Sequence, residues 1–124
     1  MPTQDVFGDY QWYTFKQVED VVDCLSKSII NRKFCPIVKS NVRGTPDLKF
    51  IGIFSENRPE WYMTELAACS DSIVVVPIAV ESQFLENHRI SQVINRTEMS
   101  TLCVSTKTLG LILDLKKDGS IPTI

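Results

Sequence analysis

Glycine and histidine are scarce in this sequence, and both shortages limit the chemistry that it can carry. The five glycines are scattered along the 124 residues and form neither a GxGxxG nor a Walker-type loop. No loop is therefore predicted whose backbone N–H groups could hold nucleotide phosphates. The single histidine, His88, lies in the polar stretch FLENHR. Pairing it with Ser82 or Ser91 would still leave a nucleophile triad without an orienting carboxylate and an oxyanion hole.

The four cysteines are also too far apart in the sequence to form a CxxC pair. With only one histidine beside them, the chain has no ligand spacing typical of a zinc site. Cys24, Cys69 and Cys103 fall in apolar periodic segments. We therefore expect them to be free thiols in the core of a protein from a reducing compartment.

The sequence has neither a strong charge imbalance nor a long apolar run. Its 13 basic and 15 acidic residues give a net charge of -2, which argues against a nucleic-acid partner. The longest apolar run, IVVVPIAV at residues 73–80, is too short to span a bilayer. The first residues also lack the basic and apolar pattern of a secretory signal. An intracellular protein without a transmembrane segment is the expectation.

What the sequence does contain is a regular alternation of helical and strand-like segments. Apolar spacing and turn residues predict helices over residues 15–31, 58–71, 86–97 and 107–117, and strands over residues 49–54, 73–77 and 101–105. The proline- and glycine-rich stretch at residues 35–47 is predicted to be a loop, and IPTI at residues 121–124 to begin another strand. Gly52, inside an apolar strand, predicts a close approach by another part of the chain.

Short polar patterns mark the expected starts of the helices. Thr14 and Gln17 are spaced for a capping box, and Asn57 with Glu60 repeats this spacing before the second helix. Thr106 is the expected cap of the last helix. These predictions give an α/β fold class, with one domain over residues 1–124 and a Rossmann-like parallel sheet with crossover helices.

No residue is assigned to a catalytic, cofactor-binding or metal-binding role. Ser105, Thr106 and Lys107 follow a predicted strand, where α/β folds often bind ligands, but helix capping explains them better. The nearby acidic residues resemble caps and solvated positions rather than a matched acid–base pair; they are Glu56, Glu60, Glu65 and Asp71.

Three stretches together resemble one protein family. They are YQWYTFKQVEDVVDCL, FIGIFSENRPEWYMTELAACSDSIVVVPI and ISQVINRTEMSTLCVS. In this order they are similar to the N-terminal region of long-chain acyl-CoA synthetases, the long-chain fatty-acid–CoA ligases of the adenylate-forming (AMP-binding) superfamily. The most specific pieces are YxW at residues 10–12, GIFSENRPEW at 52–61 and VINRTE at 93–98. The resemblance implies a partial N-terminal subdomain of the adenylate-forming enzyme fold.

The resemblance also implies a reaction for the full-length enzyme. Such ligases convert ATP, a fatty acid and CoA to acyl-CoA, AMP and diphosphate, with magnesium, in the cytosol or on the cytosolic face of an organelle membrane. In the family, the motifs that hold ATP and the catalytic lysine lie beyond the region matched here. The expectation is therefore a fragment of a ligase that is inactive alone.

The alternative is a non-catalytic α/β binding or interaction module derived from that fold. One segment of the chain departs from the family pattern. Where the family reads VPLYDTLG, this chain reads VPIAVESQFLENHR from Val76. Any role that residues 79–89 serve in the family is left open.

Overall fold

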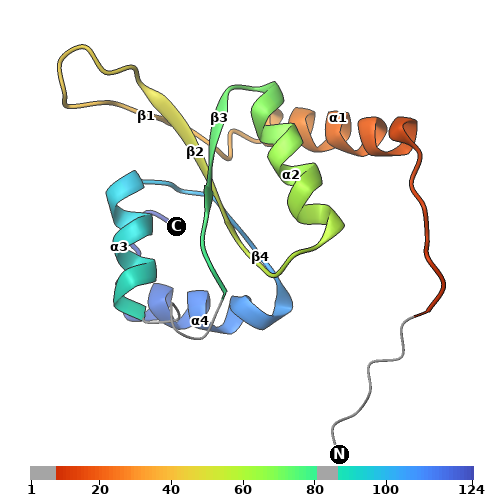
Figure 1. Cartoon of the computed structure of the whole chain (residues 1–124). Coiled ribbons are helices and arrows are strands. Elements are labelled where there is room, and N and C mark those ends of the chain that lie inside the picture. The colour runs from red at the N-terminus through yellow and green to blue at the C-terminus, as the bar shows by residue number, and fades with distance from the viewer. Residues whose placement is uncertain (1–7, 81–86) are drawn as a thin grey trace, which may run out of the picture.

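The chain folds as an α/β protein with helices packed on both faces of one sheet (Figure 1). The structure is a computed structural model that describes residues 8–80 and 87–124. Within these residues the elements are, in order, α1 (Phe15–Asn31), β1 (Ile37–Val38), β2 (Leu48–Phe54), α2 (Pro59–Ser70), β3 (Ile73–Pro77), α3 (Asn87–Thr97), β4 (Leu102–Val104) and α4 (Thr106–Lys117). The four predicted helices and the three predicted strands over residues 49–54, 73–77 and 101–105 are confirmed within a residue or two, except that residue 86 lies outside the described residues.

β2 is the central strand of the sheet. It pairs in parallel with β3 along one edge, from Lys49 opposite Ile73 to Ile53 opposite Pro77. On the other edge its second half pairs in parallel with β4, where Gly52 lies opposite Leu102. The three parallel strands are as predicted.

The sheet as a whole is nevertheless mixed rather than parallel. β1 pairs antiparallel with the start of β2, with Ile37 opposite Lys49 and Val38 opposite Leu48. The loop predicted over residues 35–47 is therefore wrong at these two positions. Two residues are too few to show a strand periodicity, and the available edge of β2 decides their conformation.

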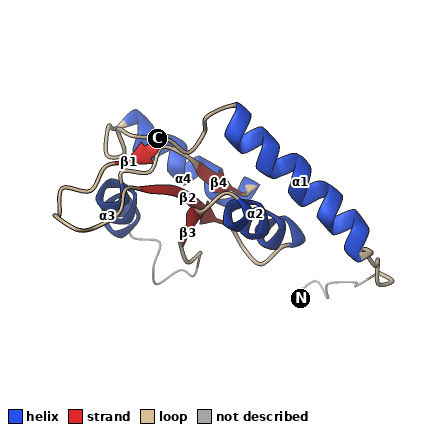
Figure 2. Cartoon of the chain, turned by 90° about the horizontal axis from the view of Figure 1, so that it is seen from above, coloured by secondary structure: helices blue, strands red, loops and turns tan. Residues whose placement is uncertain are grey.

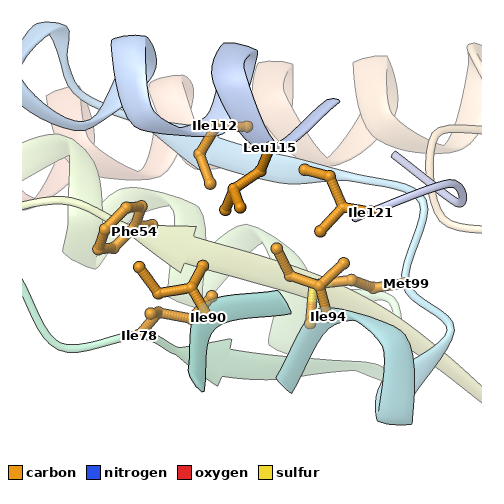
Figure 3. Packing of buried hydrophobic residues seen from close by; sticks show 8 residues of the cluster. All are labelled: Phe54, Ile78, Ile90, Ile94, Met99, Ile112, Leu115 and Ile121. Carbon is orange, nitrogen blue, oxygen red and sulfur yellow. The ribbon is translucent and has the colours of Figure 1, made fainter. Parts of the chain in front are cut away.

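Side chains alternate between the two faces of β2 and so divide the core in two. On one face Phe54 packs with residues from α3, α4 and their flanking loops, as Figure 3 shows: Ile78, Ile90, Ile94, Met99, Ile112, Leu115 and Ile121. On the other face Ile51 packs with Ile29 of α1, Ala68 of α2, Cys35 and Ile73. Burial on both faces explains why β2 is a continuous apolar run.

Two helix starts differ from the prediction, and the first is at α2. Its N-cap is Arg58, in an extended conformation and with no side-chain capping bond, so the expected cap at Asn57 is wrong. Pro59 explains the difference, because a proline drives the preceding residue out of the helical region and itself fits the first helical position. At α4 the cap is Ser105 rather than Thr106. The capping box of Thr14 and Gln17 is confirmed by reciprocal bonds of 2.8 and 3.2 Å.

The end of the described chain also differs from the prediction. Residues 121–124 form a turn and not a strand. Gly119 adopts a positive φ of 81° after α4, and the Ser120 N–H donates to the Leu115 carbonyl at 3.0 Å. This reversal points the chain back, and Ile121 becomes fully buried between α3 and α4.

The expectation of core cysteines is only partly right. Cys24 and Cys69 are exposed on their helices, while Cys103 is partly buried and Cys35 is buried. Burial raises the pKa of the Cys35 and Cys103 thiols. These two thiols therefore pack as small apolar groups, and all four cysteines are free.

Candidate functional site

The carboxyl ends of β2, β3 and β4 meet at one edge of the sheet and define the candidate site. The strands end at Phe54, Pro77 and Val104, and each leads directly into a loop or helix start. β2 leads to α2 on one face, whereas its neighbour β4 leads to α4 on the other. A crevice where adjacent parallel strands diverge in this way is where α/β sheets bind ligands.

Two hollows open at this edge. One has a volume of about 260 Å³ and lies between β2 and β4, lined among others by Arg58, Thr64, Cys103 and Thr106. The other, of about 620 Å³, lies between the ends of β2 and β3 and is lined among others by Asn57, Pro77 and Val80. Ser55 and Trp61 line both hollows. Trp61 therefore stands at the centre of the edge, where a side chain of its size separates the two spaces.

Glu56 joins the loop after β2 to the start of α4. Its carboxylate accepts a hydrogen bond of 2.7 Å from the Ser105 hydroxyl, and Lys107 Nζ lies 3.8 Å from its other oxygen. The Ser105 bond, its own backbone N–H and the Lys107 charge hold the pKa of Glu56 below its ordinary value. A carboxylate beside the first turn of α4 also complements the positive end of the helix dipole.

Thr108 anchors the same helix start from inside the core. Its hydroxyl donates to the Phe54 carbonyl at 2.6 Å and accepts the Ser105 N–H at 3.1 Å. Thr108 is buried, so both contacts are shielded from water. The last residue of β2 and the first turn of α4 are therefore held together by direct bonds.

Arg58 and Glu60 form a second charged pair at the edge. Arg58 Nε donates to Glu60 Oε2 at 3.2 Å, and Arg58 Nη2 donates to Glu60 Oε1 at 3.2 Å. This contact lowers the pKa of Glu60. Arg58 and Lys107 thus each face a carboxylate of this chain, so the edge has nearly balanced charge.

The two cations at this edge are paired within the chain. A triphosphate needs cations and N–H donors aimed at it, and both cations here are directed at carboxylates. In the part of the chain that the structure describes, no three His, Cys, Asp or Glu side chains gather as metal ligands would. The pKa of Glu56 is shifted downward, mainly by the Ser105 hydrogen bond, which is the opposite direction from the one that tunes a carboxylate as a general base near neutral pH. Glu56 and Ser105 join two segments at this edge, whereas Arg58 and Glu60 form a local surface pair.

The residues considered for a nucleophile triad lie elsewhere. His88 is on α3, where its Nε2 lies 3.3 Å from the Gln92 side chain. The Ser91 hydroxyl donates to the His88 backbone carbonyl and not to its ring. Ser82 lies outside the described residues. The described pair of His88 and Ser91 therefore has no nucleophile–base contact.

Sequence reasoning missed the contact between Glu56 and Ser105. These residues are 49 positions apart, and each was interpreted only in its local segment. The sequence did contain a signal, because Glu56 lies two residues after the end of β2 and Ser105 lies one residue after the end of β4. Adjacent parallel strands bring such positions to one edge, and the pairing of β2 with β4 was the missing information.

Comparison with known proteins relates the chain to one group of enzymes. No protein-family model matches it. It is 36% identical over 93 residues to long-chain-fatty-acid–CoA ligase 1 of Cavia porcellus, covering 75% of this chain and 12% of the relative. It is 34% identical over 114 residues to ligase 1 of Homo sapiens, covering 91% and 15%. It is 35% identical over 111 residues to ligase 5 of Rattus norvegicus, covering 88% and 14%.

These matches confirm the family resemblance. The chain is related to the acyl-CoA-forming ligases, and within them it corresponds to a region of the long-chain-fatty-acid–CoA ligases. It spans 12–15% of the length of these curated relatives. Separately, none of the helices in residues 8–80 and 87–124 is long and apolar enough to cross a membrane.

Proposed function

We propose that this chain is a scaffold region of a long-chain fatty-acid–CoA ligase. In that enzyme a fatty acid and CoA are joined at the expense of ATP, with magnesium, and this region supplies structure without catalytic groups. The sequence identity to ligases over most of the chain carries the proposal. The internal pairing of Glu56, Arg58 and Lys107 supports it, because these groups are committed to the fold.

The proposal extends to the fold and to the location of the enzyme. The parallel strands β2, β3 and β4 would form part of a Rossmann-like N-terminal subdomain of the adenylate-forming fold, with β1 as an addition. The parallel registers around β2 support this arrangement. ATP, magnesium and CoA would contact other regions of the ligase. A location in the cytosol or on the cytosolic face of an organelle membrane stays a prediction.

A chimera tests the proposal. Human long-chain-fatty-acid–CoA ligase 1 would have its matched region replaced by this chain, and acyl-CoA formation would be measured with ATP, magnesium, palmitate and CoA. If the chain is an equivalent scaffold, the purified chimera forms acyl-CoA, whereas the human ligase lacking the region does not. A soluble, folded chimera without activity would contradict the proposal.

A non-catalytic interaction module is the second candidate function. An open apolar groove between α1 and α2, flanked by exposed aromatic residues, favours it. With this second function, the chain would bind a partner protein without being part of a ligase. A folded but inactive chimera, together with stable binding of a protein unrelated to ligases, would favour this module over the scaffold.

A further inference from the structure

An apolar groove lies between α1 and α2, outside the candidate site. It has a volume of about 500 Å³, and its walls include Tyr13, Phe15, Val18 and Val22 from one side and Tyr62 and Leu66 from the other. α1 runs along the periphery of the molecule beside α2 (Figures 1 and 2). The exposed side chains of Phe15 and Tyr62 show that the groove is open to solvent.

The helix that forms one wall of this groove is poorly covered. α1 has 17 residues and a clear apolar stripe, but Ile29 near its end is its one buried residue. Phe15, at its start, is 97% exposed, and Tyr62 on α2 is 57% exposed. Most helices in proteins are stabilised by packing an apolar face. In the first half of α1 Val18 and Val22 are only partly buried, and Phe15 and Val21 are exposed.

Two further aromatic residues are exposed in the segment before α1. Tyr10 and Trp12 precede α1, are almost fully exposed and stack with ring centroids 5.9 Å apart. We call the exposed groove itself, lined by Tyr13, Phe15, Val18 and Tyr62, the α1 face. An exposed apolar surface of this kind marks an interaction site.

The charges on α1 favour a protein partner over an anionic membrane. Lys16 is paired with Glu19 at 3.1 Å and with Asp20 at 3.0 Å, and Lys27 lies 3.9 Å from Asp23. A helix that binds anionic lipid carries an excess of unpaired Lys and Arg beside its apolar face. Here each of these two lysines faces a carboxylate.

We propose that the α1 face docks onto the remaining polypeptide of the ligase, against apolar side chains from the region outside the match. The length of the relatives supports this occupant, because more than four-fifths of each lies outside the matched region. The inference rests on the proposed function, and it adds which surface of the scaffold meets the rest of the enzyme.

Oxidative footprinting of the 124-residue chain and of the chimera with human ligase 1 tests the docking. In the isolated chain Phe15 and Tyr62 should be oxidised rapidly. In the chimera the oxidation rate of Phe15 should fall roughly tenfold, in proportion to the area that a core residue loses. Phe34, which is 46% exposed at the other end of α1, is the internal control and should change little.

Each other result contradicts the docking. Equal oxidation of Phe15 in the chain and the chimera would leave the face uncovered. If Phe15 in the isolated chain becomes more protected from oxidation as the chain concentration rises, a second copy of the chain covers the face. Protection of the isolated chain on addition of palmitate, without protection in the chimera, would assign it to an acyl ligand.

If the chimera does not fold, a coexpression measurement tests the docking instead. The tagged chain would be coexpressed with human ligase 1 that lacks the matched region, and copurification would be measured. Phe15→Ser with Tyr62→Ser should abolish copurification, and Leu113→Ser on the exposed side of α4 should preserve it. No copurification by the parent chain, or equal copurification by all variants, would overturn the docking. A chimera that protects Phe15 but forms no acyl-CoA would instead refute the proposed function alone.

Discussion

Glu56 connects two segments that are distant in the sequence. Its carboxylate accepts the Ser105 hydroxyl and lies near Lys107, so the loop after β2 and the start of α4 share one contact. The carboxylate is only partly exposed, with 31% of its side-chain surface accessible. A residue in this position stabilises the strand–helix edge, and it does so more strongly while it is ionised.

The stability contributed by Glu56 should depend on pH. The Ser105 hydrogen bond lowers its pKa in the folded protein, so its contribution is complete above the unfolded value of about 4.3 and is lost as pH falls through the lower folded value. Glu56→Gln should therefore destabilise the chain near neutral pH, and the difference should shrink in acid. Urea unfolding from about pH 7 to about pH 3 measures this.

Ser105→Ala provides a second variant for the same test. It removes the hydrogen bond that lowers the Glu56 pKa, so it should reduce the same acid-sensitive part of the stability. A difference between parent and Glu56→Gln that stays constant across this range would show that the carboxylate charge does not act through this bond.

Among the polar residues at this edge, Thr108 should be the one whose substitution lowers the free energy of unfolding most. Thr108→Val keeps the shape of the side chain but removes the bond to the Phe54 carbonyl and the acceptor for the Ser105 N–H. Leaving buried polar groups unpaired should lower the free energy of unfolding by about 1–3 kcal/mol. Thr106→Val, at an exposed position two residues earlier, is the matched control and should change it by less than about 0.5 kcal/mol. Equal effects in urea unfolding would refute the assigned role of the Thr108 hydroxyl.

Among the elements, β2 organises the whole sheet. It pairs with all three other strands and places Ile51 in one core and Phe54 in the other. Gly52 lies between these residues, and a Cβ added there would overlap Leu102 Cδ1 and lie 2.7 Å from Met99 Sδ. The close approach predicted at Gly52 is therefore confirmed, and the approaching atoms are side chains.

Gly52→Ala should consequently destabilise the chain by overpacking. Leu102 and Met99 must move to admit the new methyl group, at a cost of about 1–3 kcal/mol in the free energy of unfolding. Leu102→Ala removes the closer obstacle, so the double variant should be more stable than the sum of the two single effects predicts. Chemical unfolding of the parent and three variants measures the coupling. Additive effects would mean that Leu102 is not the obstacle.

The elements that could be predicted from sequence have local causes. The Thr14 cap and the apolar spacing determine α1, and a β-branched run ended by Pro77 determines β3. The failures have tertiary causes. β1 exists because an edge of β2 is available, residues 121–124 turn back because Ile121 is buried, and the exposure of Cys24 and Cys69 depends on which helix faces are covered. The contact between Glu56 and Ser105 also has a tertiary cause, because it joins residues that are 49 positions apart in the sequence.

At the scale of the whole molecule, the described residues form a scaffold with two cores and one open face. α1 and α2 cover one side of the sheet, and α3 and α4 cover the other. The charged groups at the carboxyl ends of the strands are paired with each other. The relatedness to long-chain ligases gives this scaffold its context. The central proposal is that this region supplies structure to a ligase and no catalytic groups.

Pyrophosphate release by the isolated chain tests this claim most directly. Adenylation brings a fatty-acid carboxylate against a triphosphate, and this requires cations and donors that are free to bind both anions. Arg58 and Lys107 are instead paired with Glu60 and Glu56. Purified residues 1–124 with ATP, magnesium and palmitate should release pyrophosphate only at the background rate. Release that persists through repurification and disappears in Lys107→Met would contradict the account, because it would place a working site at this edge.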